Sequence, residues 1–294
     1  LGKGNIRWII AAISRRGTRQ TKSRSCKNEK EIILKNEFKH NILKVMGIFQ
    51  ITLPIFAITW FILFGIDLLL LVGGIALGYV FFILTMAGYH RILAHKIVHT
   101  PQWFKALYSF VGSLAFSSPP ISWASTHILH HMFSDTDKDP HSPIYLGPIK
   151  SSLFYFQTPF GEIMKKLTLR EKKKFLVSIK HLVKDQMLIF FEKNYLVMTL
   201  MYVILLAIIS PELVIYAYCI PVIYSHFGAL LVVTNHDGVF GGESNSNKHR
   251  AFNKFLLWPL VYGEHNHSDH HDAPGRADGL NNLLRKAFRK KVNG

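Results

Sequence analysis

The sequence predicts an all-α integral membrane protein with four transmembrane helices and a histidine-rich site for two metal ions on its cytosolic side. Two observations lead to this expectation. The 35 Lys and Arg residues leave two long stretches of the chain empty, and eight of the 16 histidines fall in three short groups. With 294 residues and 49% hydrophobic content, the chain is long enough for one large domain.

Two stretches without any Lys or Arg predict the membrane crossings. They are residues 45–89, which contain one acid, and residues 194–247. Each is about twice the roughly 20 residues that a helix needs to cross a bilayer, so each predicts two helices with a tight reversal between them. The reversals fall at residues 66–67 and 210–212, where Pro211 cannot continue a helix. The predicted helices are residues 45–65, 68–89, 195–210 and 213–233.

The charge distribution predicts the orientation of these helices. Both short reversals carry only an acid, whereas the rest of the chain is strongly basic, with a formal net charge of +17. The positive-inside rule then places both termini and residues 91–193 in the cytosol. Such a charge also suits nucleic acid, but here it flanks apolar spans, where anionic lipid headgroups account for it. We therefore expect the lipid bilayer as a partner, no nucleic acid, and a basic face that could attract an acidic protein.

The same charge pattern divides the chain into three parts. We expect a basic N-terminal arm over residues 1–40, a membrane domain over residues 41–285 and a basic C-terminal tail over residues 286–294. Within the membrane domain, residues 165–185 alternate basic clusters with apolar residues, which predicts an amphipathic cytosolic helix.

The three histidine groups predict a metal site. On a helix, positions i, i+3 and i+4 share one face, so the second and third groups can each direct three imidazoles to one point. The two histidines of the first group are five residues apart, about 140° on an ideal helix, and would bind two different ions or straddle a helix end. The groups are His90 and His95; His127, His130 and His131; and His267, His270 and His271.

The number and type of donors narrow the choice of metal. Imidazole suits zinc, copper, iron or nickel, and the absence of cysteine beside the histidines argues against a structural zinc finger. Eight or more ligands exceed what one ion can take. Two metal ions are therefore expected, with positions left open for oxygen or substrate.

The residues around the histidine groups follow a recognisable pattern. It consists of His90-Arg91, Trp123 four residues before His127, the run 133–141 that ends in Asp139-Pro140-His141, and Gly263-Glu264 before the third group. In these motifs, over about residues 45–285, the chain resembles the membrane fatty acid desaturase family, specifically its acyl-CoA (stearoyl-CoA, delta-9) type and their bacterial relatives. Three histidine groups with these spacings are highly specific to that family.

The resemblance implies four transmembrane helices with a cytosolic helical cap that holds two irons. It also implies O2-dependent desaturation of a fatty acyl chain, of the acyl-CoA, delta-9 type, with the eight grouped histidines as iron ligands and no further catalytic side chain. Trp123 is expected to line the apolar substrate channel. No haem, flavin or iron–sulfur motif is evident, so electrons are expected from a separate ferredoxin or cytochrome b5-like donor. The membrane would be a bacterial inner membrane or the endoplasmic reticulum.

Four carboxylates near the histidine groups are expected to orient the imidazoles from behind. Each could equally be a solvated loop charge. They are Asp135, Asp139, Glu264 and Asp272.

A ninth ligand is the main departure from the family pattern. Family members carry an Asn-x-x-x-His motif whose histidine lies two residues before Phe-Gly, and here Phe240-Gly241 places Gly238 at that position. His236 lies two residues upstream and would be a ligand if the chain bulges locally, whereas on a regular helix it would face away. Without it, water or Asp237 would complete the site.

Two other functions are open at this point. A di-iron hydroxylase of acyl chains or alkanes would share the metal site, although the run that ends in Asp139-Pro140-His141 favours desaturation. A membrane metal transporter or sensor would need ionisable residues inside the crossings. His226 is the one that the predicted helices contain.

Overall fold

The computed structural model of the chain is built from helices joined by turns. It describes residues 48–140, 142–147, 151, 160–233, 235–236, 251, 253–254, 257–276 and 278–288. The predicted N-terminal arm and residues 289–294 of the predicted tail lie outside these ranges. In the described part, an isolated antiparallel bridge pairs His236 with Ala251.

Three helical segments of the described chain are long and apolar enough to cross a membrane. The first, Leu68–Ala94, has 27 residues and joins α3 (Leu68–Thr85) to the π-helical segment η1 (Met86–Ala94). The second is α11 (Gln186–Ile209), with 24 residues. The third, Pro211–Val233, has 23 residues and comprises α12 (Pro211–Val214), η3 (Ile215–Cys219) and α13 (Ile220–Val233). The predicted first crossing corresponds to a shorter apolar helix, Ile48–Phe64, and its residues 45–47 lie outside the described ranges.

The outer faces of these helices carry large apolar side chains. Ile62, Leu69 and Ile208 are 78%, 81% and 77% exposed. Many large exposed apolar side chains along a helix are expected where lipid chains contact the protein. The long helices and their exposed faces indicate an integral membrane protein.

Both predicted reversals lie between helices, as expected. At the first, the Asp67 carboxylate accepts a hydrogen bond from Leu70 N at 2.9 Å and thereby caps α3. The backbone N–H of Asp67 donates to the Tyr216 hydroxyl at 2.8 Å, which ties this reversal to the third span. At the second, Ser210 caps α12, and Pro211 takes the first helical position, where its missing N–H costs nothing.

The second long helix begins earlier than predicted. The charge pattern predicts its start near Tyr195, after the last charged residues, but α11 begins at Gln186. Asp185 caps it by accepting hydrogen bonds from Met187 N at 3.0 Å and Leu188 N at 3.1 Å. The first turns of the helix therefore include charged residues, among them the buried Glu192.

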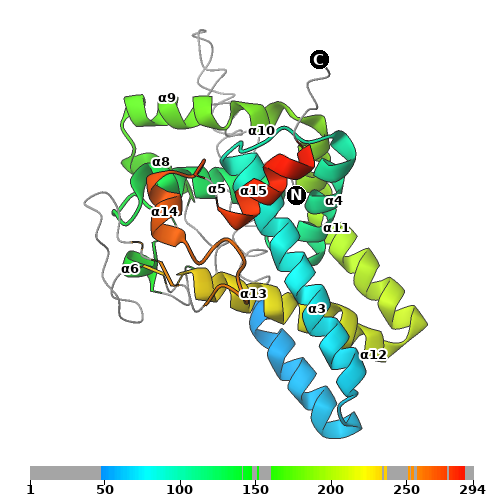
Figure 1. Cartoon of the computed structure of the whole chain (residues 1–294). Coiled ribbons are helices and arrows are strands. Elements are labelled where there is room, and N and C mark those ends of the chain that lie inside the picture. The colour runs from blue at the N-terminus through cyan, green and yellow to red at the C-terminus, as the bar shows by residue number, and fades with distance from the viewer. Residues whose placement is uncertain are drawn as a thin grey trace, which may run out of the picture.

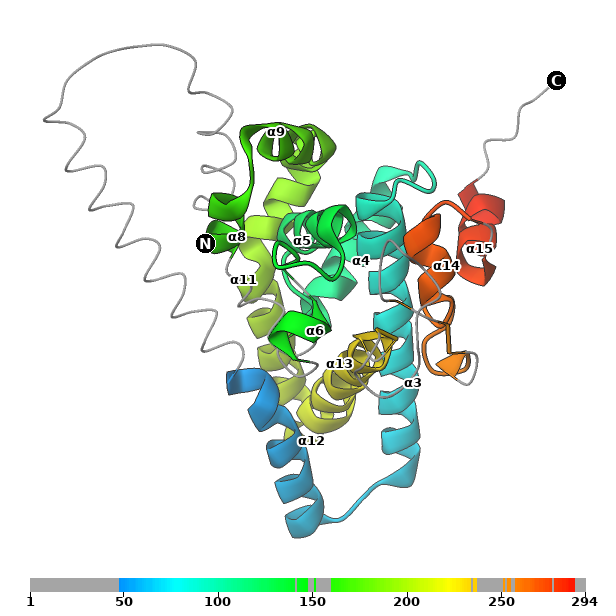
Figure 2. The same cartoon turned by 90° about the vertical axis from the view of Figure 1, so that its left-hand side faces the viewer.

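Shorter helices gather at one end of the long ones and form a cap (Figure 1). Figure 2 shows the same separation from the side, with Ile48–Phe64 and the start of α3 at the opposite end. The amphipathic segment predicted over residues 165–185 includes α9 (Leu169–Ser178) and α10 (Lys180–Lys184). Phe175 in α9, Leu182 in α10 and Ile179 between them are fully buried. The shorter helices are α4 (Gln102–Leu114), α5 (Pro120–Phe133), α6 (Pro143–Leu146), α8 (Phe160–Lys166), α9 (Leu169–Ser178), α10 (Lys180–Lys184), α14 (His267–Asp272) and α15 (Gly279–Phe288).

Candidate metal centre

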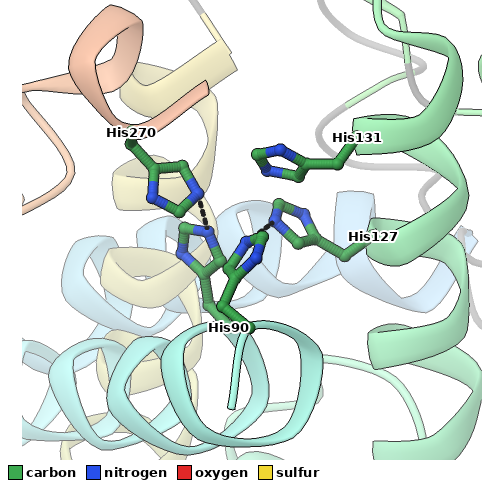
Figure 3. A group of neighbouring side chains, drawn as sticks. His90, His127, His131 and His270 are labelled. Atoms are coloured by element: carbon green, nitrogen blue, oxygen red, sulfur yellow. Dashed lines mark hydrogen bonds between the residues drawn. The ribbon is translucent and has the colours of Figure 1, made fainter. Parts of the chain in front are cut away.

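Five histidines from three separate elements converge in the cap. One ring nitrogen of each lies within 4.8 Å of one from every other member. The Nε2 atoms of His90 and His270 are 2.7 Å apart, and those of His95 and His127 are 3.0 Å apart. Figure 3 shows the rings of the labelled members pointing toward one another. We call this set the first group, and its members are His90, His95, His127, His131 and His270.

Four further histidines form a second group beside the first. Their ring nitrogens also lie within 4.8 Å of one another. The Nε2 atom of His267 is 3.0 Å from that of His236 and 3.2 Å from that of His271. The members are His130, His236, His267 and His271.

Each of the two histidine-bearing cap helices contributes to both groups. The expectation that His127, His130 and His131 all face one point is wrong, and the same holds for α14. On an α-helix, positions i and i+4 are about 40° apart, whereas i+3 and i+4 are separated by about 100°. His127 and His131 therefore join the first group, while His130 points to the second.

The first histidine pair is brought together by π-helical backbone. In η1 the hydrogen bonds span five residues, and the N–H of His95 donates to the carbonyl of His90 at 3.2 Å. Residues i and i+5 are then about one turn apart, so both side chains face the same way. The expectation that they bind two different ions is wrong, because it assumed α-helical spacing. The other alternative is confirmed: the pair straddles a helix end, because His90 lies inside η1 and His95 follows its last residue, Ala94.

His236 reaches the second group because α13 stops before it. The helix ends at Val233, Asn235 lies in a turn, and His236 forms the bridge to Ala251. The backbone at His236 is therefore irregular, as the first alternative requires, and not the regular helix on which the side chain would face away. Two neighbouring parts of the chain lie outside the described residues, namely Thr234 and residues 237–241. The second part includes Asp237 and the Phe240-Gly241 pair.

The N-terminus of α5 is held by a carboxylate from the second span. Glu192 Oε2 accepts hydrogen bonds from Ile121 N at 2.8 Å and Ser122 N at 3.2 Å, and Oε1 accepts one from the Ser122 hydroxyl at 2.5 Å. A buried negative charge suits a helix N-terminus, where backbone N–H groups lack partners. The prediction that His226 is the one ionisable residue in the crossings is wrong, because the spans extend farther toward the cap. Glu192 is an ionisable residue within the second span, and it holds the N-terminus of α5.

Three of the four predicted carboxylates contact the outward nitrogens of grouped histidines. Each Nδ1 atom that faces a carboxylate leaves Nε2 directed into its group. The pairs are Glu264 with His90 at 2.9 Å, Asp139 with His130 at 2.8 Å, and Asp135 with His236 at 3.1 Å. The fourth carboxylate, Asp272, is exposed on α14.

Three residues behind the histidines were not predicted from the sequence, namely Ser134, Arg91 and Asp278. Ser134 Oγ lies 3.1 Å from His271 Nδ1. Arg91, which entered only as part of a motif, is fully buried and contacts both His270 and Asp278. A lone arginine at the end of an apolar stretch is the signal that could have identified it, because a buried guanidinium requires several acceptors.

Burial keeps most of these rings neutral. It lowers the pKa of His95, His131, His267, His270 and His271, and neighbouring histidines lower it further. Arg91 adds to this effect at His95, His267 and His270. Neutral imidazole is the form that binds metal. Burial also lowers the pKa of His130, but Asp139 and Asp135 outweigh it and raise the pKa.

The carboxylate behind the first group stays ionised. Burial would raise the pKa of Glu264, but Arg91 and His90 outweigh it and bring the pKa to about 2. A negative charge at this position compensates part of the charge of a bound cation.

The donor set fits two metal ions. It consists of nine imidazoles without a thiolate, which suits iron, zinc, copper or nickel. Nε2 of His131 is buried and has no hydrogen-bond partner among the described residues, so its lone pair is available to a metal. Because the nine rings divide into sets of five and four, each set can hold one ion.

A partly open cavity adjoins both groups. His90 and His127 of the first group and His130 of the second form part of its wall. Trp123, whose ring stacks on that of His127 with centroids 5.1 Å apart, lines it as well. The remaining wall includes apolar side chains of the membrane spans, namely Met86, Ala229, Val232 and Val233. A wall that combines imidazoles with apolar side chains suits an apolar ligand.

Comparisons with known proteins agree with this geometry. The model of the fatty acid desaturase family matches residues 67–280. Delta-9 acyl-lipid desaturase 1 of Arabidopsis thaliana is 48% identical over 56 residues, which cover 19% of this chain and 18% of the relative. Delta-9 acyl-lipid desaturase 2 of the same plant is 38% identical over 88 residues, 30% of this chain and 26% of the relative. The sn-1 stearoyl-lipid 9-desaturase of Anabaena variabilis is 44% identical over 54 residues, 18% and 20% of the two chains. These matches span only about a fifth to a quarter of each relative, whereas the family model covers more than half of this chain. The chain therefore belongs to the fatty acid desaturase family.

Proposed function

We propose that this protein desaturates a fatty acyl chain in an O2-dependent reaction at a histidine-ligated di-iron centre. One observation carries the proposal. Two adjacent groups of imidazoles share the wall of a cavity whose other side is formed by apolar residues of the membrane spans. An acyl chain could enter this cavity with its methylenes beside both groups.

The metal supplies the chemistry that side chains cannot. Two bound irons would provide, with O2, the oxidant that an unactivated C–H bond requires. The chain's own residues hold and orient these ions through nine imidazoles, three of which are backed by carboxylates. Trp123 stacks on His127 and at the same time faces the cavity, so it would hold the acyl chain against the first group.

The carrier of the acyl chain has two candidates. The sequence motifs favour acyl-CoA, while the relatives in Arabidopsis and Anabaena are named as acyl-lipid or stearoyl-lipid desaturases. We propose acyl-CoA as the first substrate to test and a membrane lipid as the second. Supplying the same labelled acyl group in both forms to bilayers that contain the protein separates the two.

Electrons would come from a separate ferredoxin or cytochrome b5-like protein. Basic residues of α8 to α10 are exposed on the cap and could attract an acidic donor. They are Lys165, Lys166, Arg170, Lys173, Lys174, Lys180 and Lys184. We place this cap and both termini in the cytosol. Because salt screens the attraction between charged surfaces, it should strongly slow the reduction of the protein by its donor.

Expression in a desaturase-deficient host, followed by fatty acid profiling, tests the proposal. The protein should produce new double bonds, and His270→Ala should abolish them. His99→Ala is the matched control, because His99 is exposed and lies outside both groups. If new double bonds are absent although iron is bound and a donor is present, the desaturase assignment is wrong, and hydroxylated chains would indicate the hydroxylase instead.

A further inference from the structure

A single buried arginine connects the end of the first span to the C-terminal part of the cap. Arg91 follows His90 in η1 and is 0% exposed. Its guanidinium contacts residues 263–278, which are more than 170 positions away in the sequence. The cap segment that carries α14 is thereby attached to the segment that carries the first histidine pair.

Each of the five N–H donors of this guanidinium has an acceptor. Nε and Nη2 both donate to Glu264 Oε1, at 3.1 and 3.0 Å, and Nη2 also donates to the Gly263 carbonyl at 3.1 Å. Nη1 donates to Asp278 Oδ2 at 2.7 Å and lies 3.1 Å from His270 Nδ1. Arginine has five donors in a fixed planar fork and no acceptor, so His270 Nδ1 must be the acceptor in the last contact.

This arrangement fixes two members of the first group at once. Glu264, which is held by Arg91, contacts His90 Nδ1 at 2.9 Å. Arg91 itself donates to His270 Nδ1, so a neutral His270 carries on Nε2 the proton that a metal ion would displace. Both rings are thereby turned so that their Nε2 atoms meet at 2.7 Å inside the first group. The second group relies on other supports, since Asp139 backs His130 and Asp135 backs His236.

The backbone around the arginine is shaped for this contact. Gly263, whose carbonyl accepts from Nη2, has a φ of +86°, a conformation that glycine adopts without strain. Asp278 accepts from Arg91 with one carboxylate oxygen and from Asn281 N with the other, at 2.7 Å, and so also caps α15. The arginine thus fixes the positions of the segments on both sides of α14.

We propose that Arg91 is a positioning residue that sets the metal affinity of the first group selectively, through Glu264 and His90. The proposal rests on the proposed di-metal site. Loss of such support behind a metal ligand typically weakens metal binding about 10- to 100-fold. Lysine should not replace Arg91, because it offers three donors on a compact ammonium and cannot form the planar fork.

Titration of the metal-free full-length protein with Fe²⁺, under anaerobic conditions and against a competing chelator, tests this assignment. The wild type should bind two ions. In Arg91→Gln and Arg91→Lys, one site should weaken about 10- to 100-fold while the other keeps its affinity. Arg276→Gln is the matched control and should bind as the wild type, because Arg276 is 64% exposed and pairs with Asp269 on the surface.

A second variant covers the case in which Arg91 variants do not fold. Asp278→Asn leaves the guanidinium in place and weakens one of its contacts, and it should also reduce the affinity of one site alone. Asp135→Asn, which acts behind His236, should weaken the other site, so that combining it with Asp278→Asn weakens both.

The outcomes separate this inference from the proposed function. Unchanged affinity at both sites in the Arg91 variants, equal weakening of both, or recovery by lysine would overturn the positioning role. A wild type that binds fewer than two ions would overturn the di-metal site and this inference together. A wild type that binds two ions but forms no double bond would refute only the proposed activity, and the variant titrations would still decide the role of Arg91.

Discussion

Replacing Glu192 with glutamine removes the negative charge at the N-terminus of α5 and keeps the shape of the side chain. The carboxylate of Glu192, which is 5% exposed, accepts hydrogen bonds from two backbone N–H groups and one hydroxyl. Charge-assisted bonds contribute about 1.5–3 kcal/mol each and neutral ones about 0.5–1.5 kcal/mol. For the two N–H bonds the loss is about 2 kcal/mol, and the lost attraction to the helix terminus adds about 0.3–1 kcal/mol.

We therefore expect Glu192→Gln to lower the free energy of unfolding by about 2–3 kcal/mol. Because α5 carries three of the grouped histidines, iron content should fall at both metal sites rather than at one. Thermal unfolding of the protein in detergent, together with iron analysis, measures both effects. Glu212→Gln is the control, because Glu212 lies in the first turn of α12, at the start of the third span. A Glu192→Gln protein as stable as the wild type would show that the charge does not hold α5.

Three further results are expected. The Glu171 carboxylate pairs with Lys138 and caps α9, and these contacts lower its pKa to about 2. The stability that the ionised carboxylate contributes is therefore full above pH 4.5 and is lost as the pH falls toward 2. Unfolding temperatures measured across this range should fall less steeply in Glu171→Gln than in the wild type. Gly78→Ala should destabilise the membrane part by about 1–3 kcal/mol, because the added Cβ would lie 2.6 Å from Tyr224 Cβ, whereas Gly73→Ala has open space and should unfold at the wild-type temperature or above. Chelation of the bound metal should lower the apparent unfolding temperature, because a free metal concentration of 100 times the Kd stabilises the folded protein by about 2.7 kcal/mol per site. An unchanged unfolding temperature would show that metal does not stabilise the cap.

The sequence allowed the three long apolar helices and the convergence of the histidines to be predicted, because both depend on local patterns. Long stretches without Lys or Arg correspond to the apolar helices, and the two reversals lie where an acid or a proline interrupts them. The start of α11 was misplaced because a charged residue was taken to lie outside the membrane helix. Glu192 lies inside it, since its carboxylate finds donors on α5, a contact that no local pattern reveals.

The division of the histidines between two groups depends on backbone geometry that spacing alone does not determine. His90 and His95 share a group because η1 is π-helical, and His236 belongs to the second group because α13 ends at Val233. Neither departure from regular α-helix has a simple sequence signature. The support that Arg91 gives to the first group was missed for a different reason, because its partners lie far away in the sequence.

Mass spectrometry of the product formed from a saturated acyl substrate under isotopically heavy O2 tests the central claim most directly. The iron-loaded protein, placed in bilayers with an electron donor, should yield a chain that has lost two hydrogens from adjacent methylenes and carries no heavy oxygen. A chain that contains heavy oxygen, or a chain that is unchanged while both metal sites are filled, would contradict the assignment of this protein as a fatty acyl desaturase.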